Sequence, residues 1–277
     1  MFPRKVDFSE SDLFWNIKKY VLTNWYSEIK FLKKDSRILF VGSDYSRDLN
    51  LIFKSFGYNQ NNSQHSNYFN ERILNTFSLK EQFSWAVGIS KPSDRLWFND
   101  HDEQLNPKEE IRKGTLKTIL DSDIIVIIPS NAEIYHIKSD IEKIFWRIPN
   151  KKQVFDREIN YRNTSIHENV LNMSEIVKIV NDIKPEIKII IFPSPVKVAF
   201  SHKISTLSWN LLTKTILLAS ISEVCQKNEN CYYFPCLELF YEMPADLYNK
   251  DFRHPLPETE KIVFEMFLEL FSENELV

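Results

Sequence analysis

A chain of 277 residues with 43% hydrophobic and 14% aromatic residues is long and apolar enough to bury a sizeable core, which excludes an intrinsically disordered protein. The formal net charge of −3, with lysine and arginine scattered among acidic residues, excludes the broad basic surface of a nucleic-acid-binding protein. There is no run of about 18 uncharged apolar residues and no apolar signal core near the first residue, so we expect no membrane span and a cytoplasmic protein.

Glycine and cysteine are both scarce, and their scarcity argues against several kinds of site. Only four glycines occur, and they form neither a Walker-type nor a dinucleotide-binding pattern. The three cysteines, Cys225, Cys231 and Cys236, are odd in number and lack a Cys-x-x-Cys spacing, which disfavours a disulfide framework and a zinc site. We therefore expect neither a metal nor a bound cofactor.

The first part of the chain predicts a helix, a strand and a second helix. Apolar residues at helical spacing predict a helix within 10–33, and the apolar run 38–41 predicts the first strand. Residues 47–56 place their apolar side chains on one helical face, and Gly57 is well placed to end that helix. Ser43 therefore stands at a sharp junction between strand and helix.

The rest of the chain alternates helices with apolar strands. Residues 58–105 are polar, aromatic and irregular, and we expect an excursion over the edge of a sheet. Further helices are predicted at 107–120, 173–183, 207–225 and 258–271, and further strands at 123–128, 187–192 and 231–234. Continuously apolar strands are typical of a parallel sheet covered on both faces. The sequence predicts one α/β domain over 1–277, with a helical extension over 1–35. We expect a mostly parallel, doubly wound sheet with helices on both faces, which is a three-layer α/β/α, flavodoxin-like arrangement.

Several polar residues follow the predicted strands. Ser43, Ser130 and Ser194 follow the first three strands, and the segment containing Asp251 and His254 precedes the last helix. In open α/β sheets, ligands bind outside the carboxyl ends of the strands. We therefore expect these residues to gather at that edge, although they are far apart in the sequence.

Six short motifs, in a fixed order, carry a resemblance to a known family. They are Gly42-Ser43-Asp44-Tyr45-Ser46, Phe56-Gly57-Tyr58-Asn59, Ser194-Pro195-Val196, Asn210-Leu211-Leu212-Thr213-Lys214, Tyr233-Phe234-Pro235-Cys236-Leu237-Glu238, and the Asp-x-x-His-Pro pattern of Asp251 to Pro255. The first is similar to a Gly-Ser-Cys-Phe-Ala pattern. Over about residues 36–270, the chain resembles the GSCFA family, a branch of the SGNH (GDSL-like) hydrolase superfamily.

The resemblance implies an SGNH-hydrolase-like fold and acyl transfer at an ester. A serine hydroxyl is a poor nucleophile at neutral pH unless a neutral histidine, held in the right tautomer by a carboxylate, accepts its proton. We expect Ser43 as the nucleophile, His254 as the base and Asp251 as the residue that orients it. The alternative for Ser43 is a helix N-cap. Glu133-x-x-His136 is a competing pair, for which a solvated pair in midchain is the simpler interpretation.

An oxyanion hole needs two or three donors near the developing charge. We expect the backbone N–H of Ser43 and the residues Ser130 and Asn131, on which the family's Gly-Thr pair falls, to supply them. Lys214, from the Asn-x-x-Thr-Lys motif, and Arg147 are expected to bind an acidic group of the substrate. The alternatives are a turn asparagine for Asn131 and an ordinary surface charge for Arg147.

Two functions stay open. The first is a serine-dependent hydrolase (an esterase) or O-acyltransferase that acts on a small-molecule or glycan ester in polysaccharide modification, with acyl-CoA as a candidate donor if the reaction is transfer. The second is a catalytically inactive relative that binds a glycan or a partner. Its support is that the family's Asn-Cys-His-Lys block falls on Ile144-Phe145-Trp146-Arg147, which keeps neither Asn, Cys nor His. We expect no nucleic-acid partner, and the oligomeric state stays open.

Overall fold

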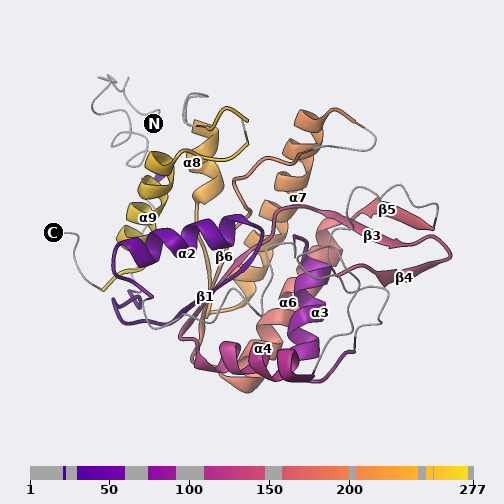
Figure 1. The fold of residues 1–277 in the computed structure, drawn as a ribbon, viewed down its shortest axis with the longest axis horizontal. Coiled ribbons are helices and arrows are strands. Elements are labelled where there is room, and N and C mark those ends of the chain that lie inside the picture. The colour runs from indigo at the N-terminus through magenta and orange to yellow at the C-terminus, as the bar shows by residue number, and fades with distance from the viewer. Residues whose placement is uncertain are drawn as a thin grey trace.

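The computed structural model describes residues 21–22, 30–59, 74–91, 109–146, 158–199, 204–242, 248–251 and 253–273. Figure 1 shows a parallel sheet with helices on both faces and a small antiparallel sheet projecting beyond it. The parallel sheet has four strands in the order β1 (Ile38–Gly42), β2 (Ile124–Ile128), β6 (Lys188–Ile191) and β7 (Cys231–Tyr233). The expected α/β fold is confirmed.

Alternate side chains of each parallel strand enter two different hydrophobic clusters. In β1, Ile38 and Phe40 belong to one cluster, whereas Leu39 and Val41 belong to the other. Every residue of β1 and of β2 is buried. Because successive side chains of a strand point to opposite faces, both faces of this sheet are covered, which explains why its strands are continuously apolar.

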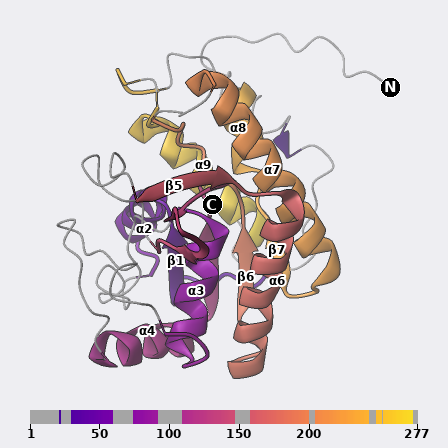
Figure 2. The ribbon, with the colours of Figure 1, turned by 90° about the vertical axis from the view of Figure 1, so that its right-hand side faces the viewer.

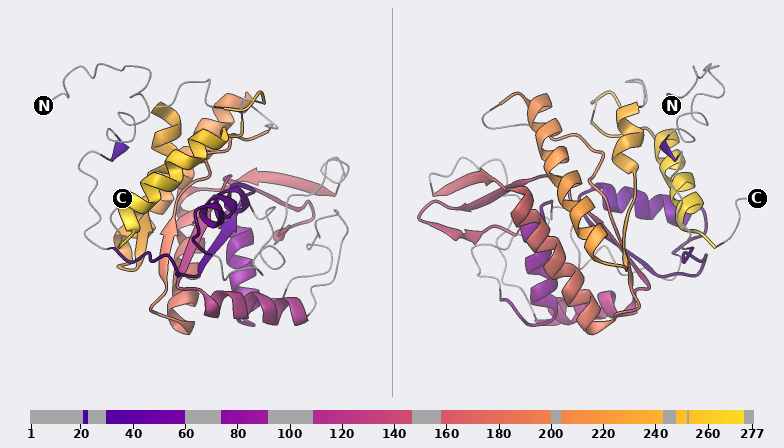
Figure 3. Two further views of the ribbon diagram at one scale, coloured as in Figure 1. Left: turned by 60° about the vertical axis from the view of Figure 1, so that its left-hand side comes forward. Right: turned by 180° about the vertical axis from the view of Figure 1, so that it is seen from behind.

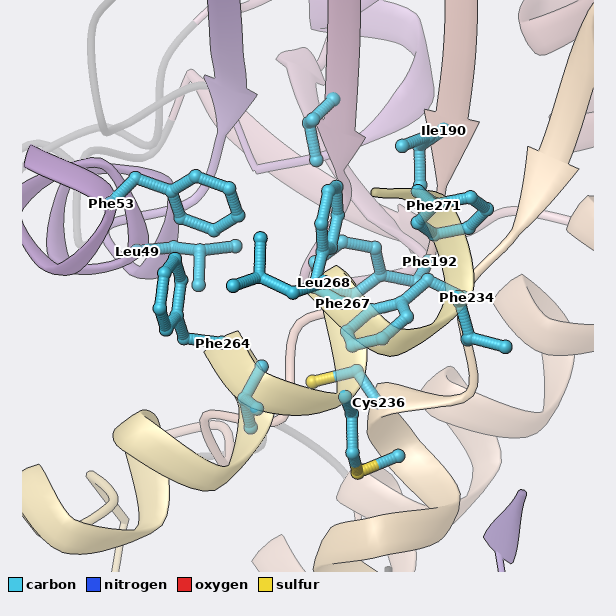
Figure 4. Packing of buried hydrophobic residues seen from close by; sticks show 14 of the residues in the cluster. Leu49, Phe53, Ile190, Phe192, Phe234, Cys236, Phe264, Phe267, Leu268 and Phe271 are labelled. Atoms are coloured by element: carbon cyan, nitrogen blue, oxygen red, sulfur yellow. The ribbon is translucent and has the colours of Figure 1, made fainter. Parts of the chain in front are cut away.

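Helices α2 (Tyr45–Ser55), α8 (Cys236–Glu242) and α9 (Pro257–Phe271) contribute to the cluster on one face of the sheet. Figure 4 shows Phe53 of α2 facing the rings of α9. The ring centroid of Phe53 lies 4.9 Å from that of Phe264 and 5.1 Å from that of Phe267, both in edge-to-face geometry. This packing joins a helix near the start of the chain to the helix near its end.

The other face is covered by α3 (Thr76–Ala86), α4 (Glu109–Asp121), α6 (Ile166–Ile183) and α7 (Thr206–Lys227), which contribute to the second cluster. Figure 2 shows α6 and α7 side by side, and the right-hand view of Figure 3 shows the same pair from behind. Among the described residues, no helix combines the length and the apolar character that a membrane crossing requires.

The small sheet was not predicted from the sequence. It has the order β4-β3-β5 and consists of β3 (Glu133–Ile137), β4 (Asp140–Ile144) and β5 (Ile159–Asn163), all antiparallel. Strands β4 and β5 have no buried residue, so their sequences are polar and lack the apolar run that identifies the central strands. The short helix α8 was also missed.

The expectation that residues 58–105 are irregular is wrong for α3. This helix buries small and polar side chains such as Ser78, Gln82 and Ser84 as well as apolar ones, so its sequence shows no clear apolar stripe. Helix α6 starts earlier than predicted, at a capping box in which Ser165 accepts from the N–H of Glu168 and the Glu168 carboxylate accepts from the N–H of Ser165.

Most of the predicted N-terminal helical extension, residues 1–20 and 23–29, lies outside the described residues. The described residues 30–35, at the end of this extension, are not helical. The N–H groups of Phe31 and Leu32 both donate to the carbonyl oxygen of Phe271, and Leu32 forms a β-bridge with Ser272. The prediction of a helix is therefore wrong for residues 30–35, because this segment pairs with the end of α9.

Candidate active site

Gly42 ends β1 in a conformation that glycine adopts without strain. Its φ is +123°, and a Cβ at this position would lie 2.3 Å from the carbonyl oxygen of Ile128 in β2. A side chain would therefore push the two strands apart. The backbone conformation of Gly42 therefore sets the direction of the chain at Ser43.

Ser43 is fully buried, and its Oγ has no hydrogen-bond partner among the described residues. Its N–H donates to the carbonyl oxygen of Ile128 at 3.0 Å. The N-cap of α2 is Asp44, whose Oδ1 accepts from the N–H of Tyr45 at 3.1 Å. The alternative interpretation of Ser43 as a helix N-cap is therefore wrong, and its hydroxyl makes no hydrogen bond in the described part of the chain.

Asp251 and His254 are in direct contact. The ring Nδ1 of His254 donates to Oδ2 of Asp251 at 2.5 Å. Oδ1 of Asp251 accepts from the N–H groups of Arg253, at 2.9 Å, and His254, at 3.1 Å. The backbone bond from Arg253 and the side-chain bond from His254 hold the pKa of the Asp251 carboxyl well below its usual range. Asp251 is thus an anion that orients the imidazole.

The segment that carries this pair is tied to neighbouring chain. Tyr248 forms a β-bridge with Pro255, and the N–H of Asn249 donates to the carbonyl oxygen of His254 at 2.8 Å. Nε of Arg253 donates to the carbonyl oxygen of Lys197, in the segment after β6, at 2.9 Å. These bonds place His254 at the edge where the parallel strands end.

The second ring nitrogen of His254 faces the junction after β1. Its Nε2 lies 3.6 Å from Oδ2 of Asp44, the residue that follows Ser43. The structure therefore brings Asp251 and His254 together with the Ser43–Asp44 junction, as expected for one edge of the sheet, but the contact of His254 is with Asp44. Asp44 was not among the predicted site residues, although an acidic residue directly after a candidate nucleophile was a usable signal.

Glu260, in the first turn of α9, is a second acidic group that was not predicted from the sequence. Burial, together with the negative charge of Asp48 and against the opposing charge of His254, raises the pKa of its carboxyl to about 7. Glu260 therefore shares an electrostatic environment with His254.

Lys214 lies beneath the surface of the same edge. It is buried, and its Nζ donates to the carbonyl oxygen of Ser130 at 2.7 Å. Burial lowers the pKa of its ammonium to about 7, although the negative charge of Asp44 acts in the opposite direction. Lys214 thus supports the loop after β2, and its role in binding substrate stays a prediction. Arg147, the other predicted substrate-binding residue, lies outside the described residues.

The backbone N–H groups of the expected oxyanion residues are engaged with the protein, whereas one side-chain donor is not. The N–H groups of Ser130 and Asn131 both donate to the carbonyl oxygen of Leu74, at 2.7 and 3.1 Å. Oδ1 of Asn131 accepts from the N–H of Glu133 at 2.6 Å, which leaves its Nδ2 as the donor that no described residue uses.

The competing pair Glu133 and His136 does not form a relay. Both residues belong to β3, and residues three positions apart in a strand point to opposite faces. Nδ1 of His136 bonds to the carbonyl oxygen of Ile137 at 2.9 Å. The described residues also hold no group of three or more His, Cys, Asp or Glu side chains arranged for a metal ion.

Comparison with known families gives a match to the GSCFA family over residues 37–267. The matched range begins just before β1 and ends in α9, so it includes Ser43, Lys214, Asp251 and His254. Comparisons with curated proteins and with solved structures gave no significant match. Because the family match covers most of the chain, the protein belongs to the GSCFA family.

Proposed function

We propose that this protein is a serine-dependent acyl-ester hydrolase or O-acyltransferase of the SGNH type that acts on a carbohydrate or surface-glycan ester. The observation that carries the proposal is the position of His254. Asp251 binds one of its ring nitrogens, and the other faces the residue directly after Ser43.

The state of these groups supports a catalytic role. With Nδ1 donating to Asp251, the neutral imidazole has its lone pair on Nε2, which is the nitrogen that must accept a proton from the nucleophile. A buried hydroxyl without a partner costs about 1–3 kcal/mol, and buried polar groups in proteins are usually bonded. An unpartnered Ser43 Oγ, in the residue before the Asp44 that His254 faces, therefore fits a reacting group better than a structural one.

In the proposed reaction, Ser43 Oγ attacks the carbonyl carbon of the ester while its proton passes to Nε2 of His254. Asp251 stabilises the imidazolium. The tetrahedral intermediate then expels the alcohol, which takes the proton from His254, and leaves an acyl group on Ser43. Water or an acceptor hydroxyl, deprotonated by His254, attacks this acyl-serine and releases the free acid or the new ester.

The developing negative charge needs hydrogen-bond donors. Of the three expected residues, Asn131 offers a side-chain amide that no described residue uses, so we assign it the main role. The N–H groups of Ser43 and Ser130 would have to exchange their bonds to Ile128 and Leu74 for a bond to the intermediate.

The substrate class in this proposal rests on the family resemblance rather than on a contact. Hydrolysis and transfer share the acyl-serine step and differ in the acceptor, water or a sugar hydroxyl. In the case of transfer, acyl-CoA is the candidate donor. Lys214 and Arg147 are then the candidates for contact with an acidic group of the substrate.

A second candidate function is an inactive relative that binds a glycan or a partner. It is favoured by the buried position of Ser43, which keeps its hydroxyl from solvent. It is also favoured by Phe145 and Trp146, which fall on the Cys and His of the family's Asn-Cys-His-Lys block and which are buried in an aromatic cluster.

A fluorophosphonate probe separates the two functions because it reacts covalently with activated serines. We expect labelling of the wild-type chain and of Ser46→Ala, a matched control three residues along the same junction, and no labelling of Ser43→Ala. We also expect turnover of p-nitrophenyl acetate to fall by about 10³-fold or more in Ser43→Ala and in His254→Ala. A folded wild-type protein that neither reacts with the probe nor hydrolyses the ester would favour the binding protein.

A further inference from the structure

Three polar residues of one helix, α7, bind the loops on which the proposed active site is built. Asn210, Thr213 and Lys214 lie three and four positions apart, so they share one face of the helix. They are the polar members of the Asn-x-x-Thr-Lys motif, and Thr213 and Lys214 are buried. At these positions α7 therefore meets the rest of the protein with polar side chains, where a covered helix ordinarily presents apolar ones.

The loop after β2 is bound by two of these residues. Nζ of Lys214 donates to the carbonyl oxygen of Ser130 at 2.7 Å, and Oγ1 of Thr213 accepts from the N–H of Ala132. The two contacts lie on either side of Asn131, whose Nδ2 is the proposed oxyanion donor. An ammonium and a neutral amine both carry N–H donors, so the bond from Lys214 does not depend on its protonation state.

The orientation of the Asn131 amide is fixed as well. Its Oδ1 accepts from the N–H of Glu133 at 2.6 Å, and because only the oxygen of an amide can accept, Nδ2 must lie on the other side. The N–H of Ser43 donates to the carbonyl oxygen of Ile128, so this loop starts beside the proposed nucleophile. A donor that is held in place stabilises a developing oxyanion well, because it need not reorganise during the reaction.

Asn210 binds a different loop of the same site. Its Oδ1 accepts from the N–H of Val198, in the segment after β6, at 3.1 Å. The carbonyl oxygen of the preceding residue, Lys197, accepts from Nε of Arg253 at 2.9 Å, and Arg253 is next to His254. One face of α7 thus connects the loop of the oxyanion donor to the loop of the base.

We propose that Thr213 and Lys214 are positioning residues that hold the Asn131 amide where the oxyanion forms, and that Asn210 is a positioning residue for the loop of His254. This inference rests on the proposed function, because it gives these residues a part in that reaction. It also differs from a contact between Lys214 and an acidic group of the substrate. Such a contact has no effect on a neutral ester such as p-nitrophenyl acetate, whereas the loss of a positioning residue lowers kcat for any ester.

The first test is turnover of p-nitrophenyl acetate by Thr213→Val, which keeps the shape of the side chain and removes the acceptor. Loss of one oxyanion donor typically lowers kcat by about 10²–10³-fold, and a misplacement of about 1 Å has a similar effect. We expect kcat to fall by about 10²-fold in Asn131→Ala and by about 10-fold to 10²-fold in Thr213→Val and Lys214→Met. KM should change by less than about threefold, because the interaction is made in the transition state.

Combined variants show through which residue each position acts. Thr213→Val together with Asn131→Ala should be at most about twofold slower than Asn131→Ala, because the positioned amide is already gone. Asn210→Ala should lower kcat by about 10-fold, and this effect should multiply with that of Asn131→Ala because it acts through the other loop. Multiplying effects of Thr213→Val and Asn131→Ala would overturn the role of Thr213, and an Asn210→Ala variant with the kcat of the wild type would overturn that of Asn210.

Thr215→Val is the matched control. Thr215 lies two residues further along α7, where it is exposed and donates to the carbonyl oxygen of Leu211 at 2.9 Å within the helix. The control makes the same substitution without touching either loop, so we expect less than about a twofold change in kcat. Thr213→Ser retains the acceptor oxygen, and its kcat should stay within about threefold of that of the wild type.

A second measurement does not depend on turnover. The side-chain amide NMR signals of Asn131, assigned by their loss in Asn131→Ala, should shift in Thr213→Val and in Lys214→Met but not in Thr215→Val. Unshifted signals in the first two variants would overturn the inference. Shifted signals in a folded protein without esterase activity would support the hold of α7 on Asn131 and reject the proposed function alone.

Discussion

Two buried polar clusters in this protein satisfy their hydrogen bonds to different degrees. Between α3 and α6, Thr76 Oγ1 donates to Oδ1 of Asn169 at 2.7 Å, and Nδ2 of Asn169 donates to Oγ1 of Thr164 at 2.8 Å and to the carbonyl oxygen of Ser165 at 2.7 Å. Nδ2 of Asn172 adds a bond to Thr76 at 3.3 Å. Every member of this cluster has a partner.

The candidate active site differs. Ser43 Oγ is buried with no partner among the described residues. The ammonium of Lys214 is also buried, and it donates a hydrogen bond to one carbonyl oxygen. Buried polar groups are costly unless they are satisfied, so the first cluster contributes to stability, whereas the second subtracts from it. Such a difference is expected if the unsatisfied groups serve the proposed reaction, and four substitutions probe it.

The largest expected effect concerns Lys214 and pH. Because burial lowers its pKa from 10.5 to about 7, the unfolded chain binds the proton more tightly between these values. The free energy of unfolding should therefore be lowest below pH 7 and rise between pH 7 and 10, by roughly 4 kcal/mol from this group. In Lys214→Met this part of the rise should be lost. Urea denaturation at several pH values measures the free energy of unfolding of both proteins. An equal rise with pH in the wild type and in Lys214→Met would contradict the prediction.

Gly42→Ala should have the next largest effect. The added Cβ meets the carbonyl oxygen of Ile128, and alanine is strained at a φ of +123°. We expect a loss of at least about 3 kcal/mol in the free energy of unfolding, together with displacement of Ser43. Gly88→Ala is the control, because its φ is +83° and its nearest contact is the flexible end of Arg112 at 3.6 Å. It should lose about 1 kcal/mol. Equal losses would show that the close contact with β2 is unimportant.

Asn169→Ala removes the centre of the satisfied cluster. We expect a loss of about 2 kcal/mol, because Thr76 and Thr164 then lack their partners in a buried place. Asn172→Ala, which removes one longer bond, should lose about 1 kcal/mol or less. Thermal or urea denaturation compares the two, and a neutral Asn169→Ala would show that the cluster contributes nothing to stability.

Ser43→Ala should have the smallest effect on stability, although it is expected to abolish turnover. Removing an unpartnered buried hydroxyl deletes no hydrogen bond and relieves its desolvation cost, so we expect no loss and a gain of up to about 1 kcal/mol in the free energy of unfolding. A loss as large as that of Asn169→Ala would reveal a structural role for the hydroxyl and would remove the contrast between the two clusters.

Much of the fold was readable from the sequence because buried parallel strands must be apolar along their whole length. The strands at 38–41, 123–128 and 187–192 were located for this reason. Helix α3 and the small sheet were not, because the helix packs polar residues on several sides and strands β4 and β5 bury none of their residues. Their sequences therefore lack the apolar periodicity that distinguishes helices from strands.

For the site, the sequence alone determined which residue types follow the strands, and motif order singled out Ser43, Asp251 and His254. Only the tertiary structure decided that Nε2 of His254 faces Asp44 and that Ser43 is fully buried. The physical reason is that these distances depend on how α2 packs against α9 and on how Gly42 turns the chain. Sequence spacing carries no information on contacts between segments so far apart.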